Sequence, residues 1–177
     1  MASGKSIEVL KIAYSYEEAR KKVLLFTSSL DTRSGVGMIS SRIGAQRSAI
    51  SIVPGLDLFS VCSDHRSDCV LVDEAQFLDM PQVRQLAMVA DELNTPVLCY
   101  GLKNDFRNQL FPGSEALLIY ADKIEEVKSV CRFCNRKAIM HLRMEEGKPA
   151  RDGEQILIGG DKTYFAVCRK HWNNPPL

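Results

Sequence analysis

The run Cys69–Asp73, with the sequence CVLVD and Glu74 directly after it, decides how the rest of the chain is interpreted. A short, continuous apolar run that ends at polar residues is typical of a strand buried on both faces of a parallel sheet. Two further runs, Val23–Thr27 and Pro96–Tyr100, have the same character. Apolar residues also recur at helical spacing, at Ile7, Leu10 and Tyr14 and again at Val83, Leu86, Ala90 and Leu93. Strands that alternate with helices predict an α/β fold.

Length and composition set the limits of this fold. The 177 residues, 45% of them hydrophobic, are enough for one full core and a small appendage, which excludes two large domains. The formal net charge is only +1, so the overall balance indicates neither nucleic acid nor a membrane surface as partner. No apolar run approaches the roughly 18 residues that span a bilayer, and Met1–Ser6 is not an apolar signal core. We therefore expect a soluble, cytoplasmic protein.

A phosphate-binding motif lies before the first predicted helix. The residues Ser3, Gly4, Lys5 and Ser6 end in Gly-Lys-Ser and lead directly into the amphipathic segment. In a P-loop, backbone N–H groups at the helix start surround the phosphates, the Lys reaches the outer ones and the Ser hydroxyl ligates Mg²⁺. The full pattern needs an earlier Gly and a preceding strand, so we expect the first strand of the sheet to be missing from this chain.

Asp73 and Glu74 form the second element of a nucleotide site. They place one carboxylate at a strand tip opposite the expected Mg²⁺ and a second one beside it. The alternative is a buried strand that runs into an acidic helix cap. Ser28–Arg47, which follows the apolar run Val23–Thr27, has no sustained hydrophobic periodicity. We expect it to form a long polar loop, where such folds place ligand-binding groups.

A predicted zinc site occupies the C-terminal part of the chain. Cys131 and Cys134 form a CxxC pair, and Cys168 and His171 form a CxxH pair 33 residues further on. Thiolates and imidazole are the ligands that tetrahedral Zn²⁺ prefers, and four protein ligands leave no open position, so the metal is expected to be structural. A redox CxxC is the alternative, but it leaves the second pair unexplained.

In the order of these motifs the chain resembles the zinc-containing type II thymidine kinases. The resemblance runs from residue 1 to residue 171 and departs from the family only at the start, where the first strand and half of the phosphate loop are absent. Its features are Gly4-Lys5-Ser6, Asp31-Thr32-Arg33, Ser40-Ser41-Arg42-Ile43-Gly44, Val72-Asp73-Glu74-Ala75-Gln76-Phe77, Tyr100-Gly101-Leu102 with Asp105-Phe106, the CxxC, Ile158-Gly159-Gly160 with Tyr164, and the CxxH.

The resemblance implies ATP-dependent phosphorylation of the 5′-hydroxyl of thymidine to dTMP, in nucleotide salvage. It implies a RecA-like P-loop domain over residues 1–128 and a zinc-binding lid domain over residues 129–177. It also implies a homotetramer, and feedback inhibition by dTTP. The expected cofactors are structural Zn²⁺ and the Mg²⁺ that accompanies ATP.

Individual roles follow from the same resemblance. Glu74 matches the catalytic base, which accepts the proton of the attacking hydroxyl. The phosphates of ATP would be held by Ser3, Gly4, Lys5, Ser6 and Arg33, and Mg²⁺ by Ser6, Asp31 and Asp73. The alternative to phosphate binding by Arg33 is a solvated side chain in the loop. Thymine would lie in an apolar and aromatic pocket of Phe77, Leu102, Phe106 and Tyr164. The loop of Ile156, Leu157, Ile158, Gly159 and Gly160 would lie over the nucleoside, with its two ends anchored by the zinc site.

Two other interpretations of the sequence remain open. One is a P-loop ATPase whose zinc unit binds a protein or nucleic acid, supported by basic residues such as Arg169 and Lys170 beside the metal ligands. Nearby acids, among them Glu145 and Glu146, favour a solvated face instead. The other is a thymidine-binding chain that cannot phosphorylate, because half of its phosphate loop is missing.

Overall fold

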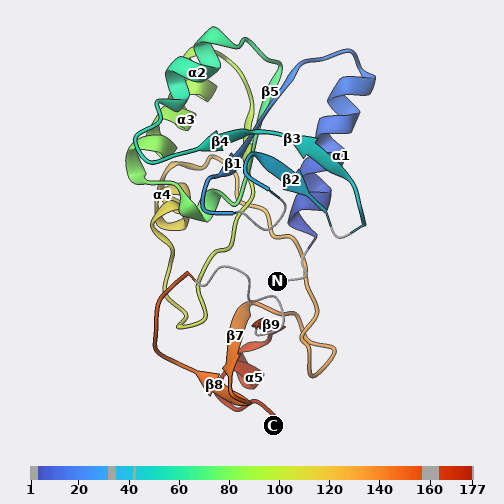
Figure 1. Ribbon diagram of the computed structural model, residues 1–177, viewed down its shortest axis with the longest axis vertical. Coiled ribbons are helices and arrows are strands. Elements are labelled where there is room, and N and C mark those ends of the chain that lie inside the picture. The colour runs from blue at the N-terminus through green and yellow to red at the C-terminus, as the bar shows by residue number, and fades with distance from the viewer. Residues whose placement is uncertain (1–3, 32–34, 42, 157–163, 177) are drawn as a thin grey trace.

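A parallel sheet forms the centre of the larger part of the molecule. The computed structural model describes residues 4–31, 35–41, 43–156 and 164–176 (Figure 1). Its main sheet has the order β4 (Ile50–Ile52), β1 (Val23–Ser28), β5 (Cys69–Asp73) and β6 (Val97–Cys99), and every pairing in it is parallel. The three apolar runs of the sequence are β1, β5 and β6. The prediction of an α/β fold with a parallel sheet is confirmed.

Helices cover both faces of this sheet. One face packs against α2 (Leu58–Asp64), α3 (Met80–Glu92) and α4 (Pro112–Tyr120), and the other against α1 (Lys5–Glu18), as Figure 1 shows. Side chains alternate along a strand, so Val70 and Val72 of β5 point to the first core while Cys69 and Leu71 point to the second. All five residues of β5 are buried, which explains why its first four are continuously apolar.

Local sequence signals fix where the helices begin. Asp79 accepts a hydrogen bond from the backbone N–H of Gln82, whose side chain in turn accepts from the backbone N–H of Asp79, and this capping box starts α3. The carboxylate of Asp57 caps α2 in the same way, through Ser60. A proline at the start of α4 suits the first turn, because the missing N–H has no partner there in any case.

The structure corrects two details of the sequence analysis. Ser28–Arg47 is not one long loop, because it contains β2 (Met38–Ser40) and the start of β3 (Gln46–Ser48), which pair antiparallel. These strands have three residues each, and β3 is fully exposed, so they carry no clear apolar pattern. In α1 the buried face is Val9, Leu10 and Ala13, whereas Tyr14 is 54% exposed.

A second, smaller sheet follows the main one in the chain. It has the order β8 (Lys148–Ala150), β7 (Met140–Glu145) and β9 (Tyr164–Val167), all antiparallel, with the short helix α5 (Arg169–Asn173) beside it. Its core includes Cys131, Leu142, Val167 and Cys168. Among the described residues, no helix has the length and apolar character needed to cross a bilayer. The division into domains at residues 128 and 129 stays a prediction.

Candidate active site

The start of α1 provides the phosphate-binding end of the site. Gly4 precedes the helix with φ of 74° and ψ of 13°, a left-handed conformation that glycine adopts without a steric penalty. Lys5 and Ser6 then occupy the first turn of a 14-residue helix. Backbone N–H groups at a helix start lack partners within the helix, and the helix dipole favours an anion there. The predicted phosphate motif therefore has the backbone arrangement that anion binding requires.

A hydrogen bond joins the two nucleotide motifs across 67 residues of sequence. The hydroxyl of Ser6 donates to Oδ2 of Asp73 at 2.7 Å, and the backbone N–H of Glu74 donates to Oδ1 at 2.9 Å. Burial and the neighbouring Glu74 raise the pKa of Asp73 above its ordinary value, and the Ser6 hydrogen bond opposes this rise. An alcohol oxygen and a carboxylate are ligands that suit Mg²⁺, so this pair is the candidate cation site.

Glu74 has a strained backbone and an immobilised side chain. Its φ of 54° lies in the left-handed region, which a non-glycine residue occupies only where its surroundings hold it there. The side chain of Gln76 donates to Oε2 of Glu74 at 2.6 Å and accepts from the backbone N–H of Leu102 at 3.0 Å. Gln76 has no exposed surface. It therefore fixes the carboxylate of Glu74 against the segment that follows β6.

Gln76 is a site residue that the sequence analysis did not single out. It belongs to the Asp-Glu-x-Gln-Phe segment on which the resemblance rests, and that was its only signal in the sequence. Gly101 explains how the two segments come so close, since a Cβ at this position would lie 3.0 Å from both the backbone nitrogen and the side-chain oxygen of Gln76. The hydroxyl of Ser114 in α4 supports the same segment by donating to the carbonyl of Leu102.

The aromatic residues predicted to bind thymidine fall into two groups. Phe106 is 1% exposed, and the ring of Tyr164 from β9 meets it edge to face at a centroid distance of 6.4 Å. Phe77 instead packs against Phe111, at 5.8 Å and an interplanar angle of 87°. Ile156 is half-buried. The structure thus brings Phe106 and Tyr164 together, while Phe77 contacts a residue outside the predicted set.

Several predicted site residues lie outside the described part of the chain. They are Ser3, Arg33, Leu157, Ile158, Gly159 and Gly160. Asp31 is described and follows the carboxyl end of β1, where its backbone N–H donates to the carbonyl of Ser28 at 3.1 Å. Because Thr27 of β1 pairs with Asp73 of β5, Asp31 lies at the same edge of the sheet as the cation-site carboxylate.

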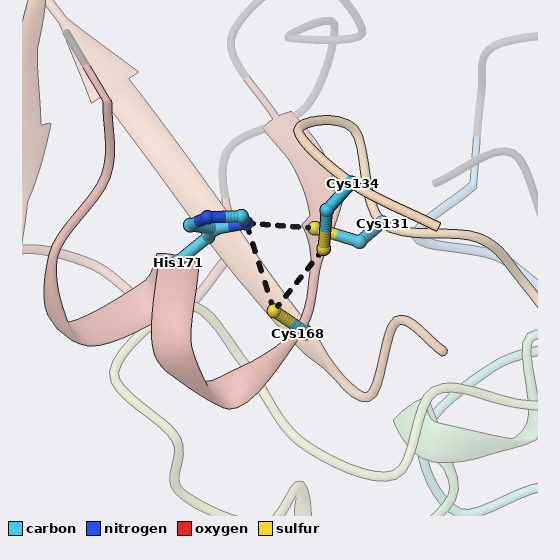
Figure 2. A group of neighbouring side chains, drawn as sticks. All are labelled: Cys131, Cys134, Cys168 and His171. Atoms are coloured by element: carbon cyan, nitrogen blue, oxygen red, sulfur yellow. Dashed lines mark hydrogen bonds between the residues drawn. The ribbon is translucent and has the colours of Figure 1, made fainter. Parts of the chain in front are cut away.

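The four predicted metal ligands form one compact cluster, which Figure 2 shows. Their donor atoms lie within 4.8 Å of one another. The sulfurs of Cys134 and Cys168 are 3.9 Å apart, and Nδ1 of His171 lies 3.3 Å from Cys131 Sγ and 3.6 Å from Cys168 Sγ. Metal–ligand bonds of about 2.0–2.3 Å in a tetrahedron put neighbouring donor atoms about 3.5–3.8 Å apart. The donor set and its spacing therefore fit a closed zinc site.

Local electrostatics at Cys131 also favour metal binding. Burial alone raises the pKa of the Cys131 thiol, but hydrogen bonds with His171, Cys168 and the backbone of Phe133 outweigh it and hold the pKa at about 6. The thiolate, rather than the thiol, is the form that binds a metal. The ligands come from two places in the fold, a turn before β7 and the start of α5, so a bound metal would join them.

Together, the parallel α/β sheet and the hydroxyl–carboxylate pair beside a helix start define a P-loop-like nucleotide-binding protein, here with a Cys₃His cluster attached. The family model for thymidine kinase matches residues 1–172. Thymidine kinase from Streptococcus pyogenes serotype M3 is 54% identical over 179 residues, which cover 100% of this chain and 95% of that protein. Thymidine kinase from Streptococcus thermophilus is 56% identical over 178 residues, covering 99% and 91%.

The chain belongs to the thymidine kinase family. The family predicted from the sequence is confirmed, and with it the expected class of enzyme, a kinase of nucleotide salvage.

Proposed function

We propose that this chain transfers the γ-phosphoryl group of ATP to the 5′-hydroxyl of thymidine, with Glu74 as the catalytic base. The observation that carries this assignment is the contact between the two nucleotide motifs, in which Ser6 and Asp73 share a hydrogen bond and Glu74 follows directly. Phosphoryl transfer depends on positioning and charge neutralisation rather than on covalent chemistry by the protein. Two carboxylates and a helix start in one place meet that need.

The role of each residue follows from its chemistry. Gly4, Lys5 and Ser6 bind the phosphates, with Ser3 and Arg33 as further predicted contacts. Ser6, Asp31 and Asp73 hold Mg²⁺, which when bound neutralises charge on the phosphate oxygens. Glu74 accepts the proton of the 5′-hydroxyl as its oxygen attacks phosphorus. The hydrogen bond from Gln76 keeps the Glu74 carboxylate in place.

The nucleoside is bound by the aromatic and apolar residues of the predicted set. Phe106 and Tyr164 form one wall, Phe77 and Leu102 lie on the chain segments that adjoin Glu74 and Gln76, and Ile156–Gly160 reads the thymine edge with backbone groups. In this proposal residues 1–128 form a RecA-like domain and residues 129–177 a zinc-binding lid. A cytoplasmic homotetramer inhibited by dTTP completes it.

The reaction is tested by measuring dTMP formed from thymidine and Mg-ATP, with Glu74→Gln beside the wild-type chain. Glutamine keeps the size of the side chain and can still accept the hydrogen bond of Gln76, but it cannot take a proton. We expect turnover to fall by about 10²–10⁴-fold, the usual effect of losing a general base. Thymidine binding, measured by calorimetry, should be unchanged.

The matched control is Glu115→Gln, which removes a carboxylate from an exposed position in α4 and should leave turnover unchanged. Near-normal turnover in Glu74→Gln would contradict the assignment of the base. A wild-type chain that binds both substrates but forms no dTMP would contradict the proposed reaction itself.

A further inference from the structure

Phe106 is held from the side of the metal cluster. Its backbone carbonyl accepts a hydrogen bond from the indole N–H of Trp172 at 3.0 Å. The guanidinium of Arg143 lies over its ring at 4.6 Å from the centroid, in cation–π geometry, and Tyr164 meets the ring edge to face. All three partners come from β7, β9 and α5, so the smaller sheet and its helix determine where this buried ring lies.

Trp172 is itself fixed by the metal cluster. It directly follows His171 in α5, and its backbone N–H donates to the carbonyl of Cys168 at 2.9 Å. Its side chain packs against the core that contains the two buried cysteine ligands, and the guanidinium of Arg151 lies 4.1 Å from the centre of its ring. In Figure 2 the helix that follows Cys168 carries His171 toward the sulfurs. A metal bound there would therefore hold the helix that carries Trp172.

The loop around Phe106 is stiff enough to transmit this constraint. The buried carboxylate of Asp105 accepts hydrogen bonds from the backbone N–H groups of Arg107 at 2.9 Å and Gln109 at 2.8 Å. It also accepts from the side chain of Gln155 at 3.1 Å. The two backbone bonds stiffen the loop. The hydrogen bond to the carbonyl of Phe106 therefore helps to orient the loop, together with the bond from Gln155.

We propose that Trp172 is a positioning residue that connects the Cys₃His cluster to the nucleoside pocket by holding the carbonyl, and hence the ring, of Phe106. The proposal rests on the assignment of Phe106 to thymidine binding. It gives the metal site a second route to the substrate, through α5 and the loop of Phe106, in addition to the predicted anchoring of the loop that contains Gly159 and Gly160. Trp172 acts through Phe106 and touches no reacting atom.

The test is Trp172→Phe, which keeps an aromatic ring in the cluster core and beneath Arg151 but removes the N–H donor. An unmade hydrogen bond of this kind costs about 1 kcal/mol, which corresponds to a roughly fivefold change in an equilibrium constant. We expect the KM for thymidine to rise about five-fold. The kcat, the KM for ATP and the zinc content should stay within a factor of two of the wild-type values.

A matched control, Phe165→Leu, loosens the same core without touching Phe106, since the ring of Phe165 contacts Phe133 and Arg132. An unchanged KM for thymidine in Trp172→Phe would overturn the proposal. An equal rise in both variants would also overturn it, because the effect would then be general loosening of the core. If the wild-type chain forms no dTMP, the same comparison is made by calorimetric binding of thymidine, which separates this proposal from the proposed reaction.

The wild-type chain offers a second readout that needs no variant. Trp172 is its only tryptophan, so the intrinsic indole fluorescence reports on this one contact. We expect thymidine to change the emission of Trp172 and ATP alone to leave it unchanged. Emission that does not respond to saturating thymidine would overturn the link between Trp172 and the pocket, even if Trp172→Phe failed to fold.

Discussion

Gly113 is the point at which α4 meets the segment that holds Glu74 and Gln76. A Cβ built at this position would lie 2.5 Å from the carbonyl oxygen of Ala75 and 2.8 Å from those of Gln76 and Leu78. All three are backbone atoms of or beside η1 (Ala75–Phe77), so no side-chain rotation relieves the contact. In Gly113→Ala the helix must move away from η1 by at least about 0.5 Å to bring the closest contact to 3.0 Å.

Overpacking of this kind costs about 1–3 kcal/mol, although alanine is the better helix former and would stabilise an unconstrained helix by up to about 1 kcal/mol. We therefore expect Gly113→Ala to lower the free energy of unfolding by about 1 kcal/mol. For a chain of this size that corresponds to a fall in Tm of about 2–4 °C. The measurement is thermal unfolding followed by circular dichroism, with the exposed replacement Glu115→Ala on the same helix as control.

The same displacement should reach the active site, because η1 begins directly after Glu74 and its middle residue orients that carboxylate. We expect the kcat for dTMP formation in Gly113→Ala to fall by more than the KM for ATP rises, at a temperature where the variant is folded. A variant as stable as the wild-type chain, with normal kcat, would refute the argument that α4 and η1 are in contact through Gly113.

Two further predictions concern the metal cluster and the cation site. The wild-type protein should hold one zinc per chain by elemental analysis. Cys134→Ser should lose the zinc and with it thymidine binding, while ATP binding persists. A variant that retains its zinc would contradict the ligand assignment. Asp73→Asn should raise the Tm in Mg²⁺-free buffer near pH 7 while abolishing kinase activity. Burial and Glu74 raise the pKa of Asp73, so its ionised form costs folding stability at neutral pH. The difference in Tm between variant and wild type should shrink as the pH falls through that raised pKa; a difference that stays constant would argue against this cause.

The parts of the structure that the sequence predicts well are those with a strong local pattern. β5 is buried on both faces, so every residue from Cys69 to Leu71 had to be apolar and the strand was evident. The two ligand pairs were equally clear, because a gap of two residues lets both side chains of a pair reach one metal. Both predictions depend on spacing within a few residues of chain.

Features that depend on distant contacts were not evident from the sequence. The two strands of the β2–β3 hairpin have three residues each and β3 is exposed, so no periodicity marks the hairpin. Helix α4 was missed because most of its residues are apolar, which leaves little contrast between its two faces. The hydrogen bond from Trp172 to Phe106 spans 66 residues and depends on where the smaller sheet lies. Such a contact has no local signal.

Residues of the active site destabilise the fold, and this has a consequence for protein engineering. Glu74 has a left-handed backbone, and Asp73 is a buried carboxylate whose pKa is raised, so both positions destabilise the fold without substrates. A screen that selects variants only for heat resistance would favour replacements at these two positions, such as glycine at 74, and would discard catalysis in doing so. Selection of a more robust thymidine kinase should therefore keep both residues fixed and vary the surface helices instead.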